Sequence, residues 1–79
     1  MHVSIFKSSK REYLYLYVPH SIGLAEVPDG LLAQFGEPER VMDLMLTPSR
    51  SLASAKAEDV LAALDDKGYY LQMPPLDPI

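Results

Sequence analysis

Alternating apolar and polar positions at the start of the chain predict a β-hairpin. Positions 3–6 and 13–18 are rich in β-branched, aromatic and aliphatic residues, which favour strands. The polar, charged run 7–12 lies between them and suits a connecting turn. The first eighteen positions therefore predict two antiparallel strands joined by a basic turn.

The second of these strands has two different faces, because side chains alternate along a strand. One face is aliphatic, and we expect it to meet the core. The other is aromatic: it either packs beneath a helix with its hydroxyls at the margin or remains partly open to solvent. The aliphatic face consists of Leu14, Leu16 and Val18, and the aromatic face of Tyr13, Tyr15 and Tyr17.

Two helices and two further strands are predicted after the hairpin. Pro28 and Gly36 are start and stop signals for a short helix, and Gly68 ends a longer helix with apolar positions at i, i+3, i+4 and i+7 spacing. Ser54 and Lys56 are the possible N-caps of the longer helix, and Lys56 is a poor one. The predicted elements are a helix of about two turns within residues 28–38, a strand over 40–47, a helix over about 56–67 and a strand over 69–73.

The resulting β-β-α-β-α-β order predicts an α+β fold. A four-stranded, mostly antiparallel sheet with both helices packed on one face would bury all the apolar stripes in one core. We expect one domain over residues 1–79, because two cores would leave each half too small to fold without disulfides or metal.

Composition and charge narrow the function classes. The chain has no cysteine, so it needs no oxidising compartment, and no stretch is long and apolar enough for a signal peptide or a membrane span. We therefore expect a cytoplasmic protein. The net charge of −4 argues against a protein that coats nucleic acid. The first eleven residues nevertheless carry three positive charges and no acidic residue, which leaves room for a local anion site.

Five segments of the chain stand out in combination: residues 8–11, 13–18, 27–28, 35–38 and 68–75. Together they resemble the YcgL family of small bacterial proteins, over about residues 4–75 of the chain. The resemblance implies an α/β domain in a proteobacterial cytoplasm. It implies no mechanism, because the family has no assigned activity, substrate or cofactor. Such proteins often continue into a polar tail after the double proline, whereas this chain stops at Ile79.

The basic turn is the first candidate binding site. Its hydroxyls, turn amides and cations could converge on a phosphate or carboxylate. The alternative interpretation is a solvated hairpin tip, since turns are often charged. The candidate residues of the turn are Ser8, Ser9, Lys10 and Arg11.

Tyrosines of the second and last strands are the second candidate, as a stacking platform for bases or a groove for a peptide. The alternative is ordinary packing, because aromatic residues favour strands. The aromatic candidates are Tyr13, Tyr15, Tyr17, Tyr69 and Tyr70.

Two features at the end of the chain have two interpretations each. Gln72 is either a polar face residue or an orienting amide, and Pro74-Pro75 is either a polyproline recognition segment or a strand terminator.

For catalysis and metal binding the sequence offers little. His2 and His20 are far apart in the sequence, with no carboxylate or cysteine at ligand spacing. Ser8 and Ser9 lie in no nucleophile elbow. Asp43 interrupts the third predicted strand, which indicates an exposed or edge strand. We expect no catalytic residue, no metal ligand and no cofactor.

The leading functional hypothesis is a non-enzymatic binding or adaptor module. The basic turn and nearby tyrosines would hold an anionic or extended partner, either protein or RNA. The first alternative is a small enzyme, or an enzyme subunit whose pocket a second chain completes. The second alternative is homo-oligomerisation through an exposed sheet edge.

Overall fold

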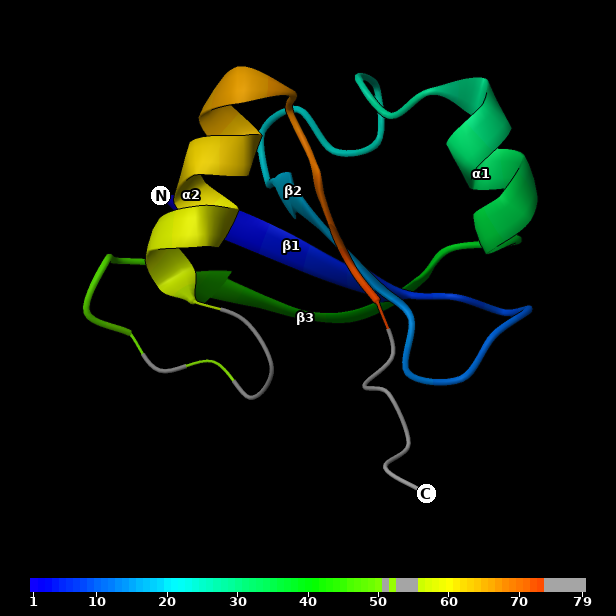
Figure 1. Cartoon of the computed structure of the whole chain (residues 1–79), viewed down its shortest axis with the longest axis horizontal. Coiled ribbons are helices and arrows are strands. Elements are labelled where there is room, and N and C mark those ends of the chain that lie inside the picture. Colours follow the sequence, from blue (N-terminus) through cyan, green and yellow to red (C-terminus); the bar gives the residue numbers. More distant parts are fainter. Residues whose placement is uncertain (51, 53–55, 74–79) are drawn as a thin grey trace.

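A computed structural model describes residues 1–50, 52 and 56–73 of the 79-residue chain. The element order is β-β-α-β-α-β, which confirms the prediction (Figure 1). The possible cap Ser54 and the Pro74-Pro75 pair lie outside the described residues. The elements are β1 His2–Lys7, β2 Tyr15–Pro19, α1 Asp29–Phe35, β3 Glu39–Met45, α2 Ala57–Asp66 and β4 Tyr70–Gln72.

The four strands form one sheet in the order β3-β1-β2-β4, and every neighbouring pair is antiparallel. The predicted α+β class and antiparallel sheet are therefore confirmed. The hairpin strands β1 and β2 occupy the centre, and β3 and β4 form the edges. Asp43 lies on the edge strand β3, as its position within an apolar run indicated.

One face of the sheet packs against α2. Val3 and Ile5 of β1 and Tyr17 of β2 lie on this face. They form a buried cluster with Leu46 and with Ala57, Val60 and Leu64 of α2. The aromatic face of the second strand thus covers a core, with Tyr17 buried and Tyr15 packed at the edge of the cluster. We call this cluster the α2 core.

The opposite face packs against α1. The aliphatic side chains of the second strand, Leu14, Leu16 and Val18, form a second buried cluster with Val27 and with Phe35 at the end of α1. We call it the α1 core. The prediction that the aliphatic face meets a core is confirmed.

The prediction that both helices pack on one face is wrong. Directly paired residues share a face: Ile5 pairs with Tyr17, and Phe6 pairs with Leu16. Consecutive residues of a strand point to opposite faces, so these two pairs lie on opposite sides of the sheet. The first pair belongs to the α2 core, and Phe6 packs with Leu16 in the α1 core, so the two helices cover opposite faces. Figure 1 shows α1 and α2 well apart. The physical reason is that β2 is apolar on both faces, and each apolar face needs its own cover.

Glycines end both helices, as predicted. Gly36 follows α1 with φ 84°, and Gly68 follows the Lys67 cap of α2 with φ 86°. The N-terminal cap positions Pro28 and Lys56 provide no side-chain hydrogen bond to any described residue. In the described part of the chain, no helix is both long enough and apolar enough to cross a bilayer.

Candidate functional site

The basic turn of the first hairpin docks on the C-terminal end of α1. The Ser8 hydroxyl donates a hydrogen bond to the carbonyl oxygen of Phe35. The Ser8 hydroxyl oxygen in turn accepts hydrogen bonds from the backbone N–H groups of Lys10 and Arg11, at 3.0 and 3.1 Å. The Ser8 hydroxyl and two turn amides were predicted to bind an anion. In the structure they form hydrogen bonds within this chain instead.

Ser9 and Lys10 complete this docking. The Ser9 hydroxyl accepts a 2.8 Å hydrogen bond from the backbone N–H of Glu37, and the Lys10 ammonium donates a 2.9 Å hydrogen bond to the carbonyl of Ala33. The last carbonyls of a helix lack intrahelical donors, and a cation there also suits the helix dipole. Both residues therefore stabilise the end of α1.

Arg11, Tyr13 and Tyr15 border a hollow of about 320 Å³ at the tip of the hairpin. Tyr13 is 63% exposed and has φ 64°, in the left-handed region. That conformation explains why β2 begins at Tyr15 and not at Tyr13. The hollow is lined by residues 7–13 together with Tyr15. The structure thus brings the basic turn and two of the candidate tyrosines together.

The tyrosines of the last strand lie elsewhere. Tyr69 packs against the α1 core and Tyr70 against the α2 core, so their rings serve opposite faces of the sheet. The Tyr70 ring meets the Tyr17 ring edge to face, with centroids 5.8 Å apart. Neither ring lines the hollow beside the basic turn.

Gln72 is a buried hydrogen-bond partner. The Tyr17 hydroxyl donates a 2.8 Å hydrogen bond to Gln72 Oε1, and both side chains are buried. Burial raises the pKa of the Tyr17 hydroxyl above its usual value, and negative charge on Tyr70 or Tyr15 would raise it further. Gln72 therefore orients a core tyrosine.

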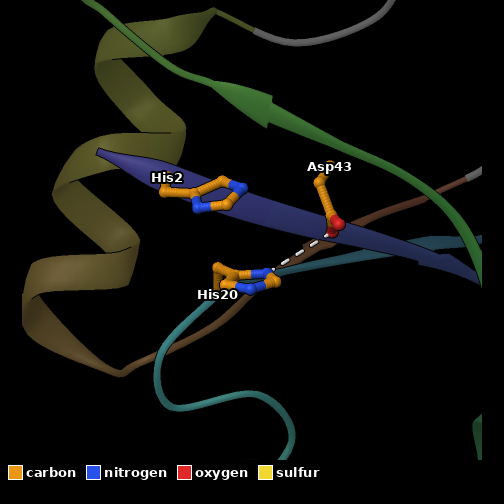
Figure 2. A group of neighbouring side chains, drawn as sticks. All are labelled: His2, His20 and Asp43. Carbon is orange, nitrogen blue, oxygen red and sulfur yellow. Dashed lines mark ion pairs between the residues drawn. The ribbon is translucent and has the colours of Figure 1, made fainter.

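A second group of polar side chains lies at the far end of the sheet from the basic turn. Val3 pairs with Pro19, so the next pair along the hairpin is His2 and His20. Their rings stack with centroids 4.0 Å apart and planes 15° apart. Ser4 pairs with Asp43 across β1 and β3. Figure 2 shows the two imidazoles and the Asp43 carboxylate turned toward one another.

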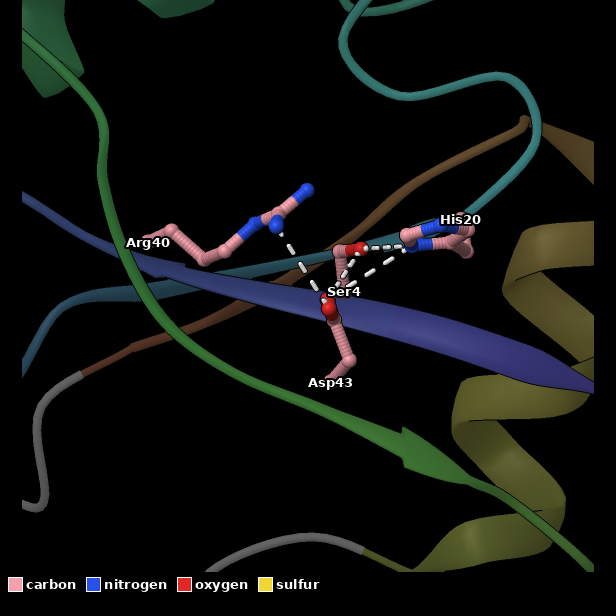
Figure 3. Close-up of polar contacts among 4 residues, drawn as sticks. All are labelled: Ser4, His20, Arg40 and Asp43. Atoms are coloured by element: carbon pink, nitrogen blue, oxygen red, sulfur yellow. Dashed lines mark hydrogen bonds and ion pairs between the residues drawn. The ribbon is translucent and has the colours of Figure 1, made fainter.

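The hydrogen bonds of this group fix where its protons lie. The Ser4 hydroxyl donates to Asp43 Oδ1 at 2.6 Å, and Ser4 Oγ lies 2.9 Å from His20 Nδ1 (Figure 3). A hydroxyl has one proton, which Asp43 receives here, so His20 Nδ1 must carry the proton between it and Oγ. In a catalytic triad the serine would donate to the histidine. Because Ser4 is also only 2% exposed, this group is not a nucleophilic triad.

Asp43 is held in its ionised form. The hydrogen bond from Ser4 is the main cause that lowers the pKa of the Asp43 carboxyl below its usual value, while desolvation opposes the shift. The positive charge of Arg40, whose guanidinium lies 3.5 Å from Oδ2, adds to the lowering. His20 Nδ1 lies 3.6 Å from Oδ1 and acts in the same direction when protonated.

The sequence model of the YcgL domain matches residues 3–75, nearly the whole chain. The chain belongs to the YcgL family. A YcgL domain-containing protein of Hahella chejuensis is 50% identical over 74 residues, which cover 94% of this chain and 70% of the relative. One of Chromohalobacter salexigens is 55% identical over 71 residues, covering 90% and 74%. The resemblance found in the sequence motifs is confirmed, and YcgL is a family of unassigned function.

The histidine group of this YcgL chain was missed by sequence reasoning. Sequence separation made His2 and His20 look unrelated, yet the hairpin register sets them opposite each other. The sequence did contain a signal for this group: polar Ser4 interrupts the first strand and Asp43 interrupts the third. Once β3 is placed beside β1, these two residues pair and mark one polar patch. Strand order, which the sequence pattern leaves open, was the missing step.

The buried Tyr17–Gln72 pair of this YcgL domain carries a prediction. Tyr17→Phe is expected to cost about 1–3 kcal/mol of unfolding free energy at pH 7, because Gln72 Oε1 loses its buried donor. The folded pKa of Tyr17 is raised, so the stability that this group contributes is present below pH 10 and is lost as pH rises through the folded value. Urea midpoints between pH 7 and 11 measure both effects.

Tyr13→Phe is the control, since it removes an exposed phenol. We expect wild type and Tyr13→Phe to lose stability together at alkaline pH, and Tyr17→Phe to lose less over that range. Equal alkaline losses in all three proteins would contradict the role given to Tyr17.

Proposed function

We propose that this protein is a non-enzymatic binding module that holds an extended acidic peptide segment at the tip of its first hairpin. The observation that carries the proposal is the hollow of about 320 Å³ bordered by both the basic turn and two tyrosines. Cations and accessible aromatic rings on one concave surface suit a peptide that presents carboxylates and apolar side chains in turn.

Arg11 is the cation best placed to meet a carboxylate. Among the described residues its guanidinium has no hydrogen-bond or ion-pair partner, whereas the Lys10 ammonium bonds to Ala33 and the Lys7 ammonium lies 3.7 Å from Glu39. A guanidinium presents paired donors that match a carboxylate in two parallel hydrogen bonds. Arg11 is therefore the proposed anchor for the acidic group.

Tyr13 supports the same site through its backbone. A left-handed φ is uncommon for an aromatic residue and costs free energy, and a ring that is 63% exposed recovers little of it by packing. Strained residues that persist on a surface cluster at binding sites. We infer that Tyr13 is retained because its ring contacts the bound segment.

The charge pattern favours a peptide over RNA. The hollow has three cations and one acidic residue, Glu12, and the whole chain carries −4. A polyphosphate backbone would meet a repulsive long-range field, while a short segment with one or two carboxylates needs only the local cations. The absence of cysteine supports a cytoplasmic setting for this role.

The test pairs two variants with a matched control. The titrants are a peptide of alternating glutamate and valine, its glutamine counterpart and a short single-stranded RNA, and the readout is the backbone amide spectrum of ¹⁵N-labelled protein. We expect the acidic peptide to shift amides of residues 8–15. Arg11→Ala should weaken binding about tenfold, the worth of roughly one charged hydrogen-bonded contact. Arg50→Ala removes an exposed cation that follows Met45, at the His2 end of the sheet and not at the hairpin tip, and it should change nothing.

Tyr13→Gly separates binding from folding. Glycine accepts the left-handed conformation, so we expect unchanged stability or a gain of about 1 kcal/mol, together with weaker peptide binding. The proposal fails if the peptide shifts no amide in the hairpin, if both variants bind as wild type does, or if only the RNA binds.

A further inference from the structure

We propose that His2, His20 and Asp43 form a binding site for one divalent transition-metal ion, of the class of Zn²⁺. One ligand atom from each of the three residues lies within 4.8 Å of the other two. The ligands come from three adjacent strand segments: His2 begins β1, His20 directly follows β2, and Asp43 lies in β3 (Figure 2). This site is separate from the hairpin hollow and does not depend on the proposed peptide binding.

One pair of ligand atoms already has nearly the spacing found around a metal. Zn²⁺ holds nitrogen and oxygen ligands at about 2.0–2.2 Å, so neighbouring ligands of a tetrahedral site lie roughly 3.3 Å apart. His20 Nδ1 and Asp43 Oδ1 are already 3.6 Å apart. The paired backbones of β1, β2 and β3 hold all three residues in register, so the site needs side-chain adjustment only.

The adjustment falls on the two imidazoles. Nitrogen lone pairs lie in the ring plane, and stacked parallel rings cannot both aim at one point, so the His2 and His20 planes must tilt toward a common ion. Both side chains are exposed, which leaves them room to turn. Coordination through His20 Nδ1 requires this atom to give up the proton that it now donates to Ser4.

Ser4 and Arg40 are outer contacts that position the carboxylate. The buried Ser4 hydroxyl keeps its hydrogen bond to Asp43 Oδ1 when His20 turns to the metal, and Arg40 lies beside Oδ2. Carboxylates and histidines that ligate metals are oriented by such hydrogen bonds. The same contacts keep Asp43 ionised, as a metal ligand must be.

The surroundings attract a cation and leave space for solvent ligands. A hollow of about 460 Å³ begins at His2 and His20, and three carboxylates also line it: Glu26, Asp65 and Asp66. Their negative charge raises the local concentration of cations. The open hollow gives water access to the fourth coordination position. Two imidazoles with one carboxylate favour a borderline metal such as Zn²⁺, Co²⁺ or Ni²⁺ over Mg²⁺ or Ca²⁺, which prefer all-oxygen ligands.

The test uses the full chain without a histidine tag, freed of metal by chelation. Zn²⁺ affinity is measured by competition with a chromophoric chelator, and Co²⁺ supplies a visible absorption spectrum that reports nitrogen and oxygen coordination. We expect one equivalent bound, with shifts of the backbone amides of His2, His20 and Asp43. His20→Gln and Asp43→Asn should each weaken binding at least tenfold. Asp29→Asn, which removes an exposed carboxylate on α1, should bind as wild type does.

Circular dichroism of the metal-free variants shows whether each variant folds, so that a loss of Zn²⁺ binding is not confused with unfolding. His2→Gln changes an exposed side chain at the start of β1 and supplies a second ligand variant if His20→Gln does not fold. Arg11→Ala should leave Zn²⁺ affinity unchanged, which separates this site from the peptide site. The inference is overturned if wild type binds no Zn²⁺ at micromolar concentration, or if folded ligand variants retain wild-type affinity and the Co²⁺ spectrum.

Discussion

Phe35→Ala is expected to remove about 3–5 kcal/mol of unfolding free energy, the usual cost of truncating a buried phenylalanine. Phe35 is completely buried and fills the α1 core between α1 and the second strand. A chain of this length has a total stability of about 4–12 kcal/mol, so the expected loss ranges from about a quarter of that stability to all of it. Urea denaturation followed by circular dichroism measures the loss.

Phe35→Leu is the matched control, because it keeps an apolar side chain of similar reach and should cost much less than the alanine variant. A small effect of Phe35→Ala, comparable to that of the leucine variant, would mean that α1 contributes little to the folded state. The α2 core alone would then stabilise the sheet, and packing in the α1 core would add little free energy.

Gly36→Ala is expected to cost about 3 kcal/mol or more. Gly36 has φ 84° and ψ −159°, a region that other residues enter only at a cost of about 1–3 kcal/mol. A methyl group here would also collide with Ser9 Oγ and lie 2.8 Å from Lys10 Cγ. The hydrogen bonds by which the turn docks on α1 would weaken, at about 0.5–1.5 kcal/mol each.

Two other glycines separate the causes. Gly23 has φ 62° and no described atom within 4 Å of an added methyl, so Gly23→Ala reports backbone strain alone, about 1 kcal/mol. Gly30 lies within α1 with an ordinary φ and equal space, so Gly30→Ala should stabilise by up to about 1 kcal/mol. If Gly36→Ala costs no more than Gly23→Ala, the turn does not press against Gly36 as described.

The elements of the fold could be predicted because each carries a local signal. Proline and glycine bound the helices, and alternating apolar residues mark the hairpin, so the predicted boundaries differ from those observed by one or two residues. The placement of the helices could not be predicted in the same way. The two faces of β2 are both apolar, and the sequence does not say which helix reaches which face.

The candidate sites divide along the same line. The basic turn and Tyr13 and Tyr15 are close in sequence, so their meeting at one hollow followed from the hairpin. The docking of Ser8 on Phe35 and the meeting of Asp43 with the histidines join distant segments. Such contacts depend on the order of the strands and on where a helix packs against the sheet, and no local sequence pattern encodes either.

The two cores on either side of the sheet constrain how this sequence can change. Side chains of the α1 core never touch those of the α2 core, because the backbone of β1 and β2 lies between them. A gain of volume at one position can thus be offset only by a loss on the same side. Homologues should accordingly show compensating size changes in two separate sets of positions.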